Sequence, residues 1–260
     1  MLIVFEHPLS PYVQKVKIAL GEKGVPFETR MPDIIGGTNL DEFVQLNPRL
    51  EVPTLVDADA SIFDSTIILE YIEEKWPTPA LLPAAPLERA RARMIEEVCD
   101  TYYEAVNWAL MEIRAFQRAT GDLADRLVGR AAEQTAGVQN WLARHLGTQP
   151  YFGGATFGWA DLCVAPFVHA SATFGNAPAP GTPLAVWLDR IRARPSVIAT
   201  FEAAAASMQG FEMLPQLIAS GVFKREYRDH RLEWMLRSGG ADIVIEGIRK
   251  ENIRFTREFS

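Results

Sequence analysis

The chain has 260 residues, of which 48% are hydrophobic and 23% are charged, and its formal net charge is -7 at pH 7. This hydrophobic share is enough for a substantial buried core, arranged in one large domain or two modest ones. The negative charge offers phosphate groups no general attraction, which argues against a nucleic-acid-binding protein. We therefore expect a small-molecule substrate.

Cysteine and histidine are too scattered to indicate a disulfide framework or a metal site. Cys99 and Cys163 lie far apart, and we expect both to be reduced, partly buried thiols. The histidines are His7, His145, His169 and His230. The apolar start of the chain is too short for a signal-peptide core, and no stretch reaches the roughly 18 apolar residues of a membrane helix. We expect a cytoplasmic protein without membrane or metal partners.

The first third of the sequence begins with a strand, a loop and a helix. Residues 2–5 are apolar and β-prone, and the loop after them ends in Ser10-Pro11. Serine at the N-cap followed by proline at the first helical position is a strong helix-start signal. Gly24 stands where the helix is expected to end.

The rest of the first third continues as strand, short helix, hairpin and helix. We predict a strand over 27–31, a helix over 41–46, hairpin strands over 52–57 and 61–63, and a helix capped by Asp64 and Ser65. The resulting order, βαβ followed by ββα, is typical of a thioredoxin-like unit. The sequence thus predicts an α/β domain over residues 1–76.

The remainder is predicted to be helical. Prolines in 77–86 mark a linker, followed by an all-helical domain over 87–208 and a C-terminal extension over 209–260. Amphipathic helices fit 87–120, 123–146, 159–174, 183–193 and 196–208. In the extension we predict a helix around 227–236, a break at 238–240 and apolar positions at 243–248. We expect the extension to be ordered and to pack on the molecule, with coverage of the cleft as the alternative.

Ser10 has two interpretations. It caps a helix, and the same helix end, with its free N–H groups and positive dipole, also favours a thiolate to which the hydroxyl donates. A thiol with a pKa of about 8.5 falls by one or more units at such a position. A serine nucleophile is the weaker alternative, because His7 is the nearby candidate base and no nucleophile elbow surrounds Ser10.

Two further sites carry a similar ambiguity. Asp64 and Ser65 either cap the third helix alone or also bind the charged groups of an amino-acid-like ligand. Pro53 is either a turn residue or, as in thioredoxin-like units, a cis-proline that exposes the backbone of Val52 to a peptide ligand. The order and spacing of the three sites carry more weight than any one of them.

Residues 7–16, His-Pro-Leu-Ser-Pro-Tyr-Val-Gln-Lys-Val, together with Val52-Pro53 and Asp64-Ser65, resemble the cytosolic glutathione transferase family, especially its serine-type phi, theta and zeta classes. The resemblance covers residues 1–208. It implies a thioredoxin-like domain joined to an all-helical domain, a homodimer, and glutathione as co-substrate.

The resemblance also implies roles for individual residues. Ser10 would stabilise the glutathione thiolate, with Tyr12 as a second donor. The backbone of Val52 before cis-Pro53 would pair with the cysteinyl part of glutathione. Asp64 and Ser65 would hold its γ-glutamyl end.

Four residues, in three parts of the sequence, depart from the family pattern. Glu51 stands where a Lys or Gln usually meets the glycine carboxylate of glutathione, and like charges there weaken binding unless Arg49 or another cation takes over. Thr38 and Asn39 replace a more basic pair, and Asn39 remains a candidate ligand-binding residue. Gly158 replaces the hydroxyl residue of a helix-capping box, so we expect Asp161 to reach back to the Gly158 N–H while the reciprocal bond is lost.

These features predict a glutathione S-transferase in which the thiolate attacks a small hydrophobic electrophile held by the helical domain. Tyr12, Tyr102, Tyr103 and Trp108 are candidates for the apolar wall, with ordinary packing as the alternative for each. Two other functions remain open: a glutathione-dependent lyase or etherase acting on aromatic ethers, and a weakly catalytic ligand-binding protein of the same fold.

Overall fold

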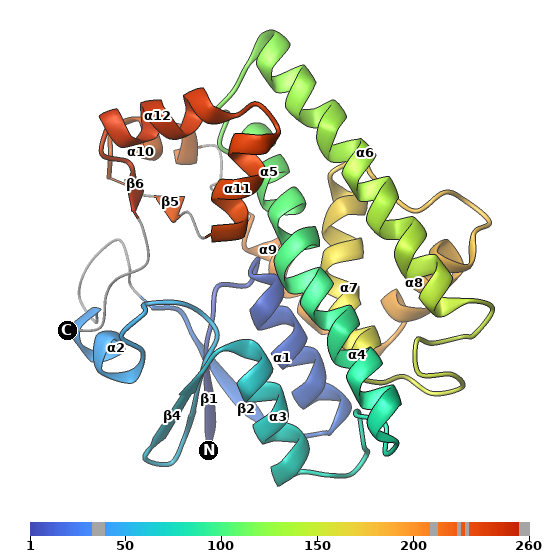
Figure 1. Cartoon of the computed structure of the whole chain (residues 1–260). Helices are drawn as coiled ribbons and strands as arrows, with labels where there is room; N and C mark the ends of the chain where they lie inside the picture. Colours follow the sequence, from blue (N-terminus) through green and yellow to red (C-terminus); the bar gives the residue numbers. More distant parts are fainter. Residues whose placement is uncertain (33–39, 209–212, 223–224, 227–228, 255–260) are drawn as a thin grey trace.

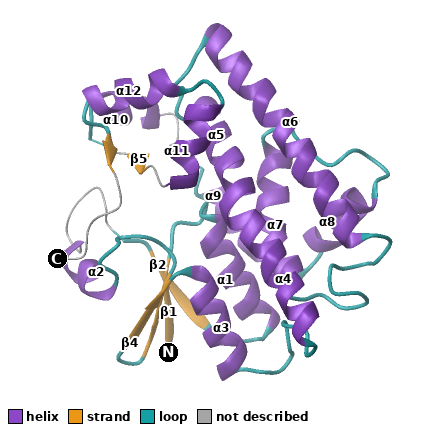
Figure 2. Cartoon of the chain, viewed as in Figure 1, coloured by secondary structure: helices purple, strands orange, loops and turns teal. Residues whose placement is uncertain are grey.

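The computed structural model describes the whole chain except residues 33–39, 209–212, 223–224, 227–228 and 255–260. A sheet with its helices forms the first third, and helices form nearly all of the remainder (Figures 1 and 2). The predicted combination of a thioredoxin-like domain and a helical domain is confirmed.

The N-terminal domain is built on a four-stranded sheet with the order β2-β1-β3-β4. Its elements are β1 (Leu2–Phe5), α1 (Pro11–Glu22), β2 (Phe27–Arg30), α2 (Leu40–Leu46), β3 (Thr54–Asp57), β4 (Ala60–Phe63) and α3 (Ser65–Lys75). Strands β1 and β2 are parallel, whereas β3 is antiparallel to both β1 and β4. All four strands predicted from the sequence are present, with bounds shifted by at most two residues.

Helix α1 starts and stops where the local sequence predicts. Ser10 is its N-cap, Pro11 its first residue, and Gly24 follows its end with a φ of 64°. Helices α1 and α3 lie on the same side of the sheet (Figure 1). Their buried residues join the strands in one core, which includes Val16, Leu20, Val4, Leu55 and Ile68.

The helical domain follows the predicted helices with one correction. It comprises α4 (Pro86–Val98), a π-helical turn (Cys99–Tyr103), α5 (Glu104–Arg114), α6 (Gly121–Leu146), α7 (Trp159–Thr173), α8 (Pro183–Arg192) and α9 (Pro195–Ala206). The helix predicted over 87–120 is therefore interrupted by the π turn and ends six residues early. Gln117, with a φ of 50°, turns the backbone after this end.

The C-terminal extension packs on the helical domain. It contains α10 (Leu214–Ala219), β5 (Arg225–Glu226), α11 (Asp229–Arg237), α12 (Ala241–Arg249) and β6 (Ile253–Arg254). Trp234 and Met235 of α11 are buried in a cluster that includes Trp108 of α5, and Arg231 pairs with Glu104 at 2.6 Å. The described residues of α11 and α12 thus pack on α5, and α10 was not predicted.

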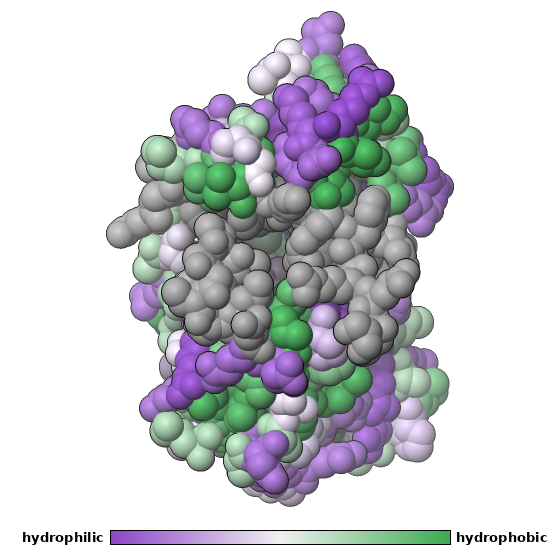
Figure 3. All heavy atoms as spheres, turned by 90° about the vertical axis from the view of Figure 1, so that its left-hand side faces the viewer, coloured by the Kyte–Doolittle hydropathy of each residue, from purple (hydrophilic) through white to green (hydrophobic). Residues whose placement is uncertain are grey.

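The face that carries α2 and the extension mixes hydrophilic and hydrophobic residues (Figure 3). Within the described part of the chain, every helix is too short or too polar to cross a membrane.

Helix α3 ends at Lys75 and α4 begins at Pro86, so the proline-rich segment predicted as a linker connects these two helices.

A buried ion cluster joins the two domains. Lys15 of α1 is fully buried, and its Nζ lies 2.6 Å from Oε1 of Glu96 in α4 and also pairs with Asp100 in the π turn. Glu96 also accepts hydrogen bonds from Thr66 Oγ1 at 2.8 Å and from Trp159 Nε1 at 2.5 Å. Burial opposes the charge on Lys15, but the neighbouring carboxylates raise its pKa well above the usual value. The lysine is therefore charged.

Gly158 shows why the capping box of α7 lacks its hydroxyl residue. The Gly158 N–H donates to Asp161 Oδ2 at 3.0 Å, as predicted. The Leu81 carbonyl accepts from Trp159 N at 2.8 Å, and a Cβ on Gly158 would lie only 2.9 Å from that oxygen. Any side chain at this position would push the linker away from the helical domain. Burial raises the pKa of Asp161 to about 6, although bonds from Trp187 and from backbone N–H groups oppose the rise.

Gly158→Ala is expected to destabilise the chain by about 1–3 kcal/mol, because its Cβ would meet the Leu81 carbonyl. Gly129→Ala, in α6, is the matched control, since a Cβ there has no atom within 4 Å. The control should be neutral or slightly stabilising because alanine favours helix. Urea unfolding of both variants measures the difference, and equal stabilities would contradict the steric explanation.

Lys15→Met is expected to cost about 3–5 kcal/mol of unfolding free energy, because it leaves Glu96 and Asp100 as buried carboxylates without their cation. The control is Lys250→Met, which removes a lysine from an exposed pair with Glu246 and should leave stability nearly unchanged. Chemical denaturation provides the measurement. A Lys15→Met variant as stable as the control would show that the cluster does not hold the domains together.

Candidate functional site

Three chain segments meet at one edge of the sheet. In the strand register, Thr54 pairs with Phe5 on one side and with Phe63 on the other. Pro53 therefore lies between the segment that follows β1 and the residue that follows β4, which is Asp64. This register brings together the segments of Ser10, Val52-Pro53 and Asp64-Ser65, the three sites that the sequence singled out.

Ser10 is held as a helix cap with its proton still available. Its Oγ accepts from Val13 N at 3.4 Å, and its own N–H donates to His7 O at 2.8 Å. Gln14 Nε2 donates to Pro8 O at 2.8 Å and fixes the loop from inside. Because the hydroxyl oxygen acts as acceptor, its hydrogen remains free to donate to an anion placed at the helix end.

Tyr12 makes a contact between the domains. Its hydroxyl donates to the backbone carbonyl of Asp100 at 2.7 Å, and its ring packs edge-on against Phe167 of α7. A tyrosine hydroxyl has one proton, and this bond occupies it. In this arrangement Tyr12 orients the helical domain against α1, and Ser10 is the better placed donor.

The Val52-Pro53 peptide bond is cis, as predicted. The loop before it is held by Asn47, whose Nδ2 donates to Glu51 O at 2.8 Å and to Thr54 Oγ1 at 3.0 Å. Val52 is half-buried, and its backbone lies outside the β3 ladder. An extended peptide can therefore approach Val52 at this edge.

Asp64 caps α3 from an unusual backbone conformation. Its Oδ1 accepts from Thr66 N at 3.0 Å and from Ile67 N at 3.3 Å, while its φ is 74°. Within the described residues, Oδ2 of this exposed side chain accepts no protein hydrogen bond. Residues other than glycine adopt such a φ rarely and at a cost of about 1–3 kcal/mol, which is most often found at functional sites. The buried Ser65 follows as the first residue of α3.

Arg49 and Glu51 form an ion pair with each other. Nε of Arg49 lies 3.0 Å from Oε2 of Glu51, and its Nη2 lies 3.4 Å from Oε1. The arginine that was expected to take over binding of the glycine carboxylate is thus in direct contact with Glu51. Asn39, the remaining candidate ligand-binding residue, lies outside the described residues.

Asp100 is a further candidate site residue, which the sequence analysis missed. Burial raises its pKa to about 7, opposed by Lys15 and reinforced by Glu96 and by the nearby Asp64. Its Oδ1 is buried and has no hydrogen-bond partner among the described residues. The sequence feature that could have indicated it is the spacing of Glu96 and Asp100, which lie four residues apart on one helical face. The cluster holds two carboxylates and one ammonium, so it can accept a further cationic donor.

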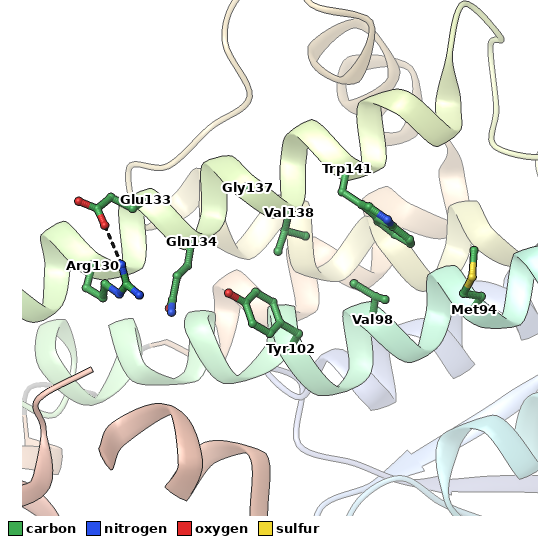
Figure 4. Close-up of a pocket in the computed structure, with 9 residues that line it drawn as sticks. All are labelled: Met94, Val98, Tyr102, Arg130, Glu133, Gln134, Gly137, Val138 and Trp141. Atoms are coloured by element: carbon green, nitrogen blue, oxygen red, sulfur yellow. Dashed lines mark hydrogen bonds and ion pairs between the residues drawn. The ribbon is translucent and has the colours of Figure 1, made fainter. Parts of the chain in front are cut away.

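The aromatic candidates for the substrate wall separate into three environments. Tyr103 is fully buried and bonded to Ser171 and Gln139. Trp108 is buried beneath Arg231 of the extension. Tyr102 is 47% exposed and points into a groove between α4 and α6 of about 510 Å³ (Figure 4). In the described part of the chain, the contacts found for these three aromatic side chains do not include one with Ser10.

The arrangement suits activation of a thiol. A sulfur at the N-terminus of α1 meets backbone N–H groups and the Ser10 hydroxyl, while carboxylates at Asp64 and Asp100 suit an ammonium group nearby. Among the described residues, no three His, Cys, Asp or Glu side chains are grouped so as to hold a metal ion.

Comparisons with known proteins point to one family. Residues 4–80 match the glutathione S-transferase N-terminal domain, and residues 128–198 match its C-terminal domain. A stringent starvation protein A homolog of Haemophilus influenzae is 32% identical over 174 residues, 65% of this chain and 74% of that protein. Glutathione S-transferase U28 of Arabidopsis thaliana is 30% identical over 168 residues, 64% of this chain and 70% of that protein.

A solved structure agrees with these matches. The crystal structure of a glutathione S-transferase from Rhodospirillum rubrum F11 superposes with a TM-score of 0.66 and 25% identity, covering 77% of this chain and 91% of that one. The matches to both domains, the relatives and the shared fold lead to the same conclusion: this chain belongs to the cytosolic glutathione S-transferase family.

Proposed function

We propose that the chain activates the thiol of glutathione for attack on a small hydrophobic electrophile. The family uses glutathione as a substrate, and the observation that carries the proposal is the Ser10 hydroxyl at the N-terminus of α1. Its oxygen already accepts the capping N–H, so its O–H is available to donate a hydrogen bond to a thiolate. The proposed setting is the cytoplasm, where glutathione is abundant.

The remaining contacts of glutathione follow from the site. The backbone of Val52 before cis-Pro53 is proposed to pair with the cysteinyl residue. The ammonium of the γ-glutamyl end would lie near Asp64 and the unpartnered Oδ1 of Asp100. Ser65, at the first position of α3, would meet the γ-glutamyl carboxylate through the helix N-terminus.

The proposed mechanism is a nucleophilic substitution or addition. The helix dipole, the free N–H groups and the Ser10 hydroxyl stabilise the thiolate, which lowers the thiol pKa towards neutrality. The sulfur then forms a bond to the electrophilic carbon, and the leaving group departs with its electron pair. The helical domain would supply the apolar wall that holds the electrophile in place.

Ser10→Ala is expected to lower turnover of glutathione with an activated aryl halide by roughly tenfold to hundredfold, the value of a hydrogen bond to a charged group. The midpoint of its pH-rate profile should rise by about one unit, because the thiolate loses a donor. Stopped or continuous absorbance assays from pH 5.5 to 9 give both values.

Thr182→Ala is the control for the capping role of Ser10. Thr182 caps α8 by accepting from Ala185 N at 3.3 Å, and a proline follows it, as at Ser10. Both variants should lose about 1 kcal/mol of stability, while Thr182→Ala keeps full turnover. Equal turnover by Ser10→Ala and the unmodified chain would overturn the role of Ser10. Ligand binding without turnover in the unmodified chain would instead support a ligand-binding protein.

We also propose a homodimer that forms through the face of α4 and α6. Met94 and Tyr102 are 45% and 47% exposed there, and Val98, Val138 and Trp141 line the same groove. Two copies related by a twofold axis would place the apolar side chains of each in the groove of the other. Exposed apolar side chains gathered in one groove are typical of an interaction surface.

Light scattering after size exclusion should give twice the chain mass of 29.0 kDa. Tyr102→Arg is expected to shift the mass towards that of the monomer, because it adds a charge to the buried centre of the interface. Val186→Arg, on the exposed face of α8, is the control and should remain dimeric. A monomer in the unmodified chain at micromolar concentration would contradict the proposal.

A further inference from the structure

We propose that the chain binds a small aromatic anion, an aryl carboxylate or sulfonate, in a pocket between the helical domain and the C-terminal extension. The pocket has a volume of about 470 Å³, in the range of small-molecule sites. We call it the extension pocket. Its lining includes Tyr102 and Ala105 from the π turn and α5, Arg130 and Gln134 from α6, and Glu233, Trp234 and Arg237 from α11.

The extension closes this pocket on one side. Trp234 Nε1 donates a hydrogen bond to Oε1 of Gln134 in α6. One turn earlier in α11, Arg231 pairs with Glu104 of α5 at 2.6 Å. The two contacts hold α11 against both α5 and α6, which are the other two sides of the pocket. The pocket is therefore a product of the packed extension.

The base of the extension pocket is apolar. Trp234 and Ala105 are buried and form this base, whereas the half-exposed Tyr102 forms a wall (Figure 4). The single N–H of the Trp234 indole is bonded to Gln134, so the indole offers its ring to a ligand and not a donor. Aromatic side chains pack well against another aromatic ring. The base thus suits a planar apolar group.

Two arginines give the rim of the pocket an excess of positive charge. The side chains of Arg130 and Arg237 are 54% and 78% exposed. Each pairs with a glutamate of its own helix, Glu133 at 3.0 Å and Glu233 at 2.7 Å. Glu233 lines the pocket, whereas Glu133 lines the neighbouring groove. The lining thus contributes two guanidinium groups and one carboxylate, in a chain whose net charge is -7.

These arginines can bind a ligand anion without leaving a buried charge unpaired. Exposed ion pairs within one helix contribute little to stability, because water screens both partners. A guanidinium has five N–H donors, so Arg237 can bind a ligand carboxylate while it keeps part of its contact with Glu233. Such a charge-assisted bond is stronger beside an apolar base than at an open surface. An aromatic ring that carries an anionic group therefore matches both parts of the pocket.

The extension pocket continues the groove proposed as the dimer interface. Tyr102, Arg130 and Gln134 line both, whereas the residues of α11 line the pocket and not the groove. A ligand anchored on Arg237 lies on the extension side, and Met94 belongs to the groove alone. Ligand binding and dimer formation are therefore expected to be compatible.

Calorimetric titration of the full chain with 2-naphthoate and 2-naphthamide isolates the ligand charge, since the two probes share one ring system. We expect naphthoate to bind about tenfold more tightly, because a hydrogen bond to a charged group is stronger than a neutral one. Saturating S-hexylglutathione, which would occupy the thiol site at Ser10, should leave this affinity unchanged. Absence of naphthoate binding, equal affinity for the two probes, or displacement by S-hexylglutathione would overturn the proposal.

Two substitutions with opposite effects locate the probe. Arg237→Gln is expected to weaken naphthoate binding by about threefold to tenfold, whereas Glu233→Gln should tighten it by about twofold to fivefold by removing the competing carboxylate. The affinity for naphthamide should change by less than about twofold in both variants, because it carries no charge. Arg144→Gln is the control for net charge, since Arg144 is exposed and lies about 20 Å along α6 from Arg130.

The outcomes separate this ligand site from the thiol site and from the dimer. Unchanged naphthoate affinity in Arg237→Gln, or weaker binding in Glu233→Gln, would overturn the extension pocket and leave the proposed role of Ser10 standing. Light scattering with and without saturating naphthoate should give the same mass. A shift from dimer to monomer would show that a second copy of the chain, and not a small anion, occupies the pocket.

Discussion

The arrangement of the two domains depends on one buried carboxylate, Glu96. It receives the ammonium of Lys15 from α1, the hydroxyl of Thr66 from α3 and the indole N–H of Trp159 from α7. A buried carboxylate is stable only when its charge is paired and its oxygens are bonded, and these three donors meet that requirement. The donors come from both domains, so the requirement also fixes how the domains lie.

The bonds of α1 and α3 to Glu96 also fix the positions of residues in the candidate site. Ser10 begins the helix that carries Lys15, and Asp64 begins the helix that carries Thr66. Tying both helices to Glu96 sets the distance between the proposed sulfur end and γ-glutamyl end of the ligand. Asp100, one turn after Glu96, then brings its unpartnered Oδ1 towards the same place. The helical domain therefore helps to shape a site whose residues lie mostly in the other domain.

Local signals predicted much of the fold. Ser10-Pro11 located the start of α1 because capping depends on neighbouring residues, and the strands followed from short apolar runs bounded by turns. The burial of Lys15 could not be predicted, since its partner Glu96 lies 81 positions away in sequence. The π turn carries Asp100, whose partners Lys15 and Tyr12 are likewise distant in sequence. The cis bond at Pro53 was predicted only through the likeness to thioredoxin-like units, and the pairing of Arg49 with Glu51 was not predicted.

The two departures from the family pattern that the structure describes are both compensated nearby. The carbonyl of Leu81 fills the space that a side chain on Gly158 would need, and Arg49 neutralises Glu51. The φ of 74° at Asp64 costs free energy. Such strain is retained mainly where the position serves a function. The strain at Asp64 and the hydrogen-bonded loop at residues 47–53 together favour a retained ligand site over one that has lost its function.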